Sequence, residues 1–156
     1  AVLSAFMFNA AINAFLFMDF ATSTSVSEMV LNTATGDTGA QEVQWLYSAS
    51  LLTVMVGMPP ASYFLARHDW ACLLLSVVLN VLGAWLRLIS IHAGEWRIAL
   101  ISSVAIGCAG SFIACSFSLV PERWFRPEQR GLATALAVQA NYTGWALGSP
   151  LPLYVT

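Results

Sequence analysis

The sequence predicts an all-α fold, a polytopic bundle of membrane-spanning helices. Hydrophobic residues make up 58% of the 156 residues and charged residues only 9%, against about 25% charged in an ordinary soluble domain. The apolar residues gather in five stretches, each of roughly the 20 residues that a helix needs to cross a bilayer. The low charge excludes a disordered chain. The net charge of −2, without any lysine, excludes a strongly basic nucleic-acid binder.

The five stretches are expected to be helices, because an open strand in lipid leaves backbone groups without hydrogen bonds. Membrane strands would also alternate apolar and polar residues, and these stretches do not. Asp19 is the only charge in the first stretch, and Arg87 is a single charge near the end of the third. The expected spans are roughly 3–27, 44–66, 70–91, 98–120 and 131–155.

The loops predict the orientation, because arginine-rich loops stay on the cytoplasmic side. The second and fourth loops hold four arginines, whereas the third loop and the adjoining end of the third span hold two, Arg87 and Arg97. The first loop, roughly 28–43, is acidic and has no arginine. We therefore expect a cytoplasmic N-terminus and a cytoplasmic surface that carries Arg67, Asp69, Arg123, Arg126 and Arg130.

One face of the first span is polar and aromatic. This face suits the lining of a water-filled cavity, although Asn, Ser and Thr also form ordinary hydrogen bonds between membrane helices. Asp19 lies off the face; it is a candidate for attracting a cation or exchanging a proton, or it forms a structural ion pair. At 100° per residue, the face consists of Asn9, Asn13, Phe17, Phe20, Thr24 and Ser27.

The fifth span combines a packing face with an aromatic face. Its small residues Ala133, Ala137, Ala140, Gly144 and Gly148 recur at a spacing that lets two helices approach closely. Beside them lie polar and aromatic residues, and aromatic faces attract cations such as quaternary ammonium groups. The alternative is a lipid-facing tryptophan with an asparagine that bonds a neighbouring helix. The residues concerned are Asn141, Tyr142, Trp145 and Ser149.

No pattern in the chain predicts an enzyme, a metal site or a cofactor. There is no nucleophile motif, no glycine-rich phosphate loop and no zinc-binding helix. The three cysteines have no metal-ligand spacing, and His68 and His92 lie far apart in loops. We therefore expect neither catalysis nor a bound cofactor.

The fourth loop resembles the junction between the fourth and fifth helices of the major facilitator superfamily. The matching residues are Arg123-Trp124-Phe125-x-Pro127-x-x-Arg130-Gly131-Leu132-Ala133-Thr134-Ala135. Pro127 fits the start of a helix there. The second loop takes the place of the superfamily's signature between helices two and three, but Ala66 stands where the signature aspartate is expected.

A narrower resemblance is to the feline leukaemia virus subgroup C receptor (FLVCR) family. It implies a twelve-helix facilitator for choline and ethanolamine, with haem export as a further association. This chain would supply five of the six helices of the N-terminal lobe, with the sixth helix and the C-terminal lobe absent. The family's choline-contacting Trp and Gln fall on Phe17 and Tyr142. The matching strings are Asn13-Ala14-Phe15, Val43-Gln44-Trp45-Leu46, Pro60 to Leu65, Asn80 to Trp85, Trp124-Phe125 and Asn141 to Pro152.

The resulting hypothesis is a multi-pass facilitator that moves a small organic solute by alternating access. Its partners are the solute, the bilayer and the C-terminal lobe of the same protein, and its expected location is the plasma membrane, with an organelle membrane as the alternative. The rival hypotheses are a transporter of another metabolite or an anion, and a receptor that binds without transporting. The candidate substrate contacts are Asn13, Phe17, Phe20, Asn141, Tyr142 and Trp145, with Asp19 for coupling or cation attraction.

Overall fold

The computed structural model of the chain describes residues 2–18, 37–93 and 95–150. These residues form five α-helices and contain no strand, which confirms the predicted all-α class. The helices are α1 (Val2–Met18), α3 (Asp37–Arg67), α4 (Asp69–Ala93), α5 (Trp96–Trp124) and α6 (Pro127–Gly148).

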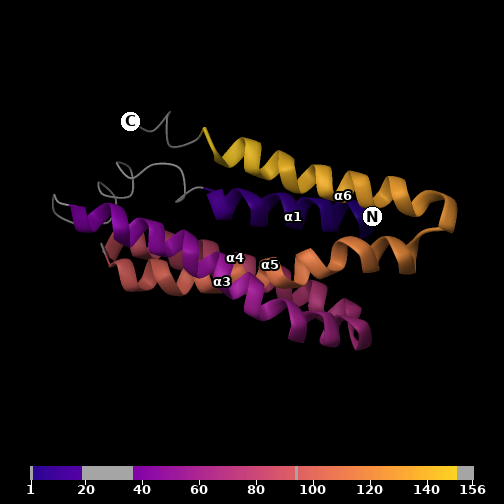
Figure 1. Ribbon diagram of the computed structural model, residues 1–156, viewed down its shortest axis with the longest axis horizontal. Helices are drawn as coiled ribbons and strands as arrows, with labels where there is room; N and C mark the ends of the chain where they lie inside the picture. Colours follow the sequence, from indigo (N-terminus) through magenta and orange to yellow (C-terminus); the bar gives the residue numbers. More distant parts are fainter. Residues whose placement is uncertain (1, 19–36, 94, 151–156) are drawn as a thin grey trace.

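The helices form two groups that lie side by side (Figure 1). In one group α1 packs along α6. In the other, α5 packs against both α3 and α4, and α5 also contacts α1 and α6. The N-terminal end of α1, the turn between α3 and α4, and the turn between α5 and α6 lie at the same end of the bundle (Figure 1). The arginine-bearing turns therefore share one end, as the expected topology requires.

Three helical segments are long and apolar enough to cross a membrane: Gln44–Arg67, Asp69–Ser90 and Trp96–Trp124. They correspond to the second, third and fourth expected spans. The described part of α1 is apolar but has only 17 residues, and the rest of the first expected span lies outside the described residues. α6 is not among the three segments, because polar side chains such as Gln129, Gln139 and Asn141 lower its hydropathy.

The helices extend further into the expected loops than the hydropathy pattern indicates. α3 begins at Asp37, inside the first expected loop. α5 continues through Pro121 to Trp124, and α6 begins at Pro127 with proline in its first turn. The turn between them is therefore short, since a proline at the first helical position fits the helix without losing a hydrogen bond. Hydropathy marks where side chains stop being apolar, not where the backbone stops being helical.

The outer surface of the bundle is apolar. Large side chains such as Met55, Leu74 and Trp85 are exposed over more than 60% of their area. Single exposed apolar residues are common in soluble proteins, but so continuous a surface indicates contact with lipid or with other apolar segments. This surface and the low charge agree with a membrane protein.

Small residues make the closest contacts between helices. At Gly107 of α5, an added Cβ atom would lie 2.6 Å from the carbonyl oxygen of Ser50 of α3. At Gly144 of α6, an added Cβ atom would lie even closer to the backbone oxygen of Ala11 of α1. These contacts confirm the packing role predicted for the small residues of α6, in which Ala133, Ala137, Gly144 and Gly148 are all buried.

Candidate functional site

Phe17, the aromatic candidate on α1, is covered in this structure. Its side chain is 9% exposed and packs with Leu16 and Ile106. The ring of Tyr47 of α3 meets it edge-on, with ring centroids 6.4 Å apart. Phe17 therefore lies where α1 meets α3 and α5, and Tyr47 is a neighbour that sequence reasoning did not identify.

Asn13 lies one turn before Phe17 and is bonded between helices. Its Nδ2 donates to Oδ1 of Asn80 on α4 at 2.7 Å and to the backbone oxygen of Ile106 on α5 at 3.1 Å. Asn9, one turn earlier, donates to Oγ of Ser76 at 2.9 Å. For Asn9 and Asn13, the structure thus shows interhelical hydrogen bonds, the second of the two interpretations of the polar face.

The aromatic candidates on α6 are open. Tyr142 is 57% and Trp145 38% exposed, and their rings form an edge-on pair with centroids 6.5 Å apart. Asn141 beside them is half-buried. The structure brings Tyr142 and Trp145 together, but among the described residues no ring contact joins this pair to Phe17. Asp19 and Phe20 lie outside the described residues.

Arg123 connects the end of α5 to the turn between α3 and α4. Its Nη1 lies 2.9 Å from the carboxylate oxygen Oδ2 of Asp69, and its Nη2 donates to the backbone oxygen of Ala66 at 3.0 Å. Ala66 is the position where the signature aspartate was expected. Arg123 thus donates to the backbone oxygen of Ala66, and its carboxylate partner is Asp69, three residues further along the chain.

Two of the other predicted arginines make contacts of their own, and the third is exposed. The guanidinium of Arg67 lies 4.5 Å from the ring centroid of Tyr63, a cation–π contact. Arg130 donates from Nε to the backbone oxygen of Phe125 at 3.3 Å. Arg126 is exposed and immediately precedes α6. The prediction that these residues share one surface agrees with the positions of their helices.

Arg87 lies near the end of α4, as the sequence indicated, but its side chain is buried. The side chain is 5% exposed and donates to the backbone oxygen of Leu16 on α1. An arginine within an apolar stretch can be recognised from the sequence, and a charge in a membrane span is expected to have a partner. The partner on α1 could not be identified without the fold.

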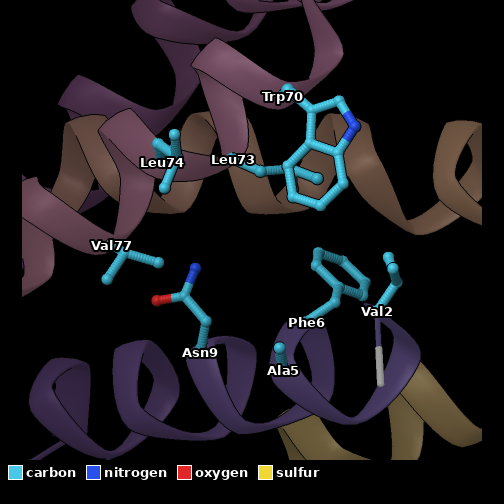
Figure 2. A pocket seen from close by; sticks show the side chains of 8 residues that line it. All are labelled: Val2, Ala5, Phe6, Asn9, Trp70, Leu73, Leu74 and Val77. Carbon is cyan, nitrogen blue, oxygen red and sulfur yellow. The ribbon is translucent and has the colours of Figure 1, made fainter.

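A cavity of about 140 Å³ lies between α1 and α4 (Figure 2). It is apolar except for Asn9, whose amide projects from α1 toward Val77 (Figure 2). None of the predicted substrate residues lines it. Among the described residues, no group of three or more His, Cys, Asp and Glu could hold a metal ion. The cavity is lined by Val2, Ala5, Phe6, Asn9, Trp70, Leu73, Leu74 and Val77.

Apolar helices, an apolar outer surface and polar bonds between spans define a multi-pass membrane protein. A family model described as the Major Facilitator Superfamily matches residues 1–156. The chain belongs to this superfamily of transporters, as the motif around Arg123 predicted.

Several curated relatives show which members of the superfamily this chain resembles. An uncharacterized MFS-type transporter of Caenorhabditis elegans is 31% identical over 72% of this chain and 19% of its own length. The choline/ethanolamine transporter flvcr2a of Danio rerio is 28% identical over 70% of this chain and 24% of its own length. The choline/ethanolamine transporter FLVCR1 of Felis catus is 27% identical over 97% of this chain and 26% of its own length. The resemblance to the FLVCR family is confirmed at low identity, and the chain spans about a quarter or less of the length of these relatives.

Proposed function

We propose that the protein carries choline, ethanolamine or a similar small organic cation across a membrane by alternating access. Support comes from the superfamily and from relatives named as choline/ethanolamine transporters. The observation in this chain that supports the proposal is the exposed Tyr142–Trp145 pair on α6. Aromatic faces bind quaternary ammonium groups, and an exposed pair offers two such faces at one site.

The proposal gives the two motif positions different roles. Tyr142 stands where the family's glutamine contacts the substrate, and its ring and hydroxyl both suit a cation or an alcohol group. Phe17 stands where the family's tryptophan lies, but Tyr47 and the helices around it cover its ring here. Phe17 would contact a substrate only in a conformation in which α1 has moved relative to α3. Asn141 and Trp145 would complete the contact on α6.

The cluster around Arg123 would serve closure on the cytoplasmic side. Asp69 and Ala66 are held by one guanidinium, so the end of α5 and the turn between α3 and α4 move together. With the arginine-rich loops on the cytoplasmic side, the N-terminus is cytoplasmic too. Arg67, Arg126 and Arg130 would face the partner lobe or anionic lipid instead of the substrate.

Radiolabelled choline uptake by cells that express the full-length protein tests the proposal. We compare the parent with Tyr142→Ala and Tyr142→Phe, and use Leu147→Ala, a similarly exposed residue of α6, as the control. Loss of a cation–π contact should raise the KM for choline by about 2- to 30-fold in Tyr142→Ala. We expect a smaller rise in Tyr142→Phe and none in the control.

Each other result has a definite meaning. Saturable uptake that is unchanged in Tyr142→Ala removes Tyr142 from the site. Absence of choline and ethanolamine uptake, from a protein detected at the membrane, rejects the proposal in favour of another metabolite, an anion or haem. Choline binding without flux into vesicles would instead support a receptor.

A further inference from the structure

Four buried polar side chains form a continuous chain of hydrogen bonds between α1 and α4, which we call the amide ladder: Asn9, Asn13, Ser76 and Asn80. Nδ2 of Asn13 donates to Oδ1 of Asn80 at 2.7 Å, and Nδ2 of Asn80 donates to Oδ1 of Asn9 at 2.8 Å. Asn9 then donates to Ser76 at 2.9 Å, and Ser76 donates to the backbone oxygen of Leu73 at 2.7 Å. All four side chains are at most 7% exposed.

The spacing of the amide ladder fixes two degrees of freedom of α1. Asn9 and Asn13 are one turn apart on α1, and Ser76 and Asn80 are one turn apart on α4. Because residues on two successive turns of each helix are hydrogen-bonded at once, α1 can neither rotate nor slide along α4 without breaking at least one of these bonds. Asn80 is the central member, since its amide accepts from Asn13 and donates to Asn9.

Apolar packing between α1 and α4 is incomplete beside the ladder. The cavity of about 140 Å³ lies between the two helices on the N-terminal side of the ladder, and Asn9 is part of its wall (Figure 2). A void contributes no contacts to hold neighbouring helices together. Beside the cavity, the hydrogen bonds of the ladder therefore hold α1 and α4 together where apolar contact is missing.

Phe17 lies on the same face of α1 as the ladder, one turn after Asn13. Asn13 also donates to the backbone oxygen of Ile106, and Ile106 packs against Phe17. We infer that Asn80 is a positioning residue: through the amide ladder it sets the rotation and register of α1, and so the place of Phe17 at the substrate site. The part that concerns substrate rests on the proposed function; the part that concerns α1 does not.

The test uses the full-length protein with Asn80→Ala. The matched control is Ser102→Ala, because Ser102 makes a buried interhelical hydrogen bond from α5 to the backbone oxygen of Gly83 of α4 at 2.7 Å, and this bond joins α4 to α5 instead of α4 to α1. The first readout is the distance distribution between spin labels at Ile12 of α1 and Val81 of α4, both on the outer surface. Asn80→Ala should broaden or shift this distribution, and Ser102→Ala should leave it as in the parent.

The second readout is choline uptake. Loss of one membrane hydrogen bond corresponds to about a three- to 18-fold change in an equilibrium constant, and Asn80→Ala removes two. We expect KM to rise by at least that factor in Asn80→Ala with Vmax within about twofold of the parent, because α1 must then be ordered when substrate binds. An equal effect of Ser102→Ala would mark Asn80 as merely structural.

The two readouts separate failure of this inference from failure of the proposed function. An unchanged distance distribution in Asn80→Ala overturns the positioning role whatever the substrate. A changed distribution in a protein that does not take up choline keeps the positioning of α1 and rejects only the substrate. If Asn80→Ala does not reach the membrane, Asn9→Ala is used instead, because it keeps the hydrogen bond between Asn13 and Asn80 and removes those to Ser76 and from Asn80. The same two outcomes apply to it.

Discussion

Gly144 of α6 lies so close to Ala11 of α1 that a Cβ atom at position 144 would collide with the backbone oxygen of Ala11. One turn later, a Cβ atom at Gly148 would lie 3.0 Å from the backbone oxygen of Phe15. The α1–α6 pair is therefore held by main-chain contact over this turn. In lipid, where burial of apolar surface drives little association, such close contact is a main source of helix–helix stability.

Replacing Gly144 should destabilise the protein. A side chain there meets backbone that cannot move aside, and overpacking of this kind costs about 1–3 kcal/mol. Thermal unfolding of the purified full-length protein in detergent, followed by tryptophan fluorescence, should show a lower Tm for Gly144→Ala and a still lower one for Gly144→Leu.

Gly131→Ala is the matched control, because a Cβ atom at Gly131, near the start of α6, meets nothing within 4 Å. In a helix, replacing glycine by alanine gains about 0.5–1 kcal/mol. Its Tm should equal or exceed that of the parent. Equal Tm values for Gly131→Ala and Gly144→Ala would contradict the close contact between α1 and α6.

The small-residue face of α6 could be predicted from the sequence, because the spacing of glycine and alanine along one helix is sufficient to define a packing face. The helical class followed in the same way from composition. Both are properties of a single segment. The ends of α3 and α5 could not be predicted in the same way, because hydropathy marks where side chains are apolar and not where the backbone begins or stops being helical.

The amide ladder was predicted only in part. Asn9 and Asn13 stand out as polar residues on an apolar helix, but Asn80 lies on another helix and drew attention only through a family-like string. Which faces of two helices meet depends on the whole bundle, so the contact between Asn80 and α1 could not be read from a single sequence. For the same reason, the sequence could not distinguish a water-filled cavity from interhelical bonds, or find Tyr47 beside Phe17.

The seam between α3 and α5 should depend more on its glycine than on its serine. At Gly107 an added Cβ atom would lie 2.6 Å from the backbone oxygen of Ser50, so Gly107→Ala should cost about 1–3 kcal/mol through overpacking. Ser111 lies one turn away and makes only long bonds to α3, at 3.3 and 3.4 Å. Ser111→Ala should cost about 0.6 kcal/mol or less. Guanidinium-induced unfolding would contradict this order if Ser111→Ala were the more damaging change.

The ion pair between Arg123 and Asp69 should be weakly stabilising and sensitive to salt. Both side chains are partly exposed, at 44% and 27%, and pairs of this kind contribute about 0.2–1 kcal/mol. A double-mutant cycle with Arg123→Ala and Asp69→Asn measures the coupling, which should fall as the ionic strength rises.

Arg123→Ala should cost more than Asp69→Asn, because the guanidinium also holds the backbone oxygen of Ala66. Arg126→Ala removes an equal charge from an exposed position and serves as the control. A coupling that is independent of salt, or as large for Arg126 as for Arg123, would show that the pair does not act as described.

Phe17 and Tyr142 are both candidates for substrate contact, but their variants should behave differently in stability measurements. Phe17 is 9% exposed and Tyr142 57%. Replacing a buried phenylalanine by alanine costs about 3–5 kcal/mol in soluble cores. In lipid only the packing part is lost, so we expect about 1–3 kcal/mol for Phe17→Ala. Tyr142→Ala should change stability by less than about 0.5 kcal/mol, as at other exposed positions.

This difference decides how transport data are interpreted. A loss of uptake in Tyr142→Ala with an unchanged Tm reports on substrate, whereas the same loss in Phe17→Ala combines substrate contact with packing against Tyr47. Tyr47→Ala separates the two, because it uncovers Phe17 and removes no candidate contact. If Phe17 meets substrate only after α1 has moved away from α3, Tyr47→Ala should lower the KM for choline, since the covered state is then less favoured. An unchanged or higher KM would argue that Phe17 is a packing residue in every conformation.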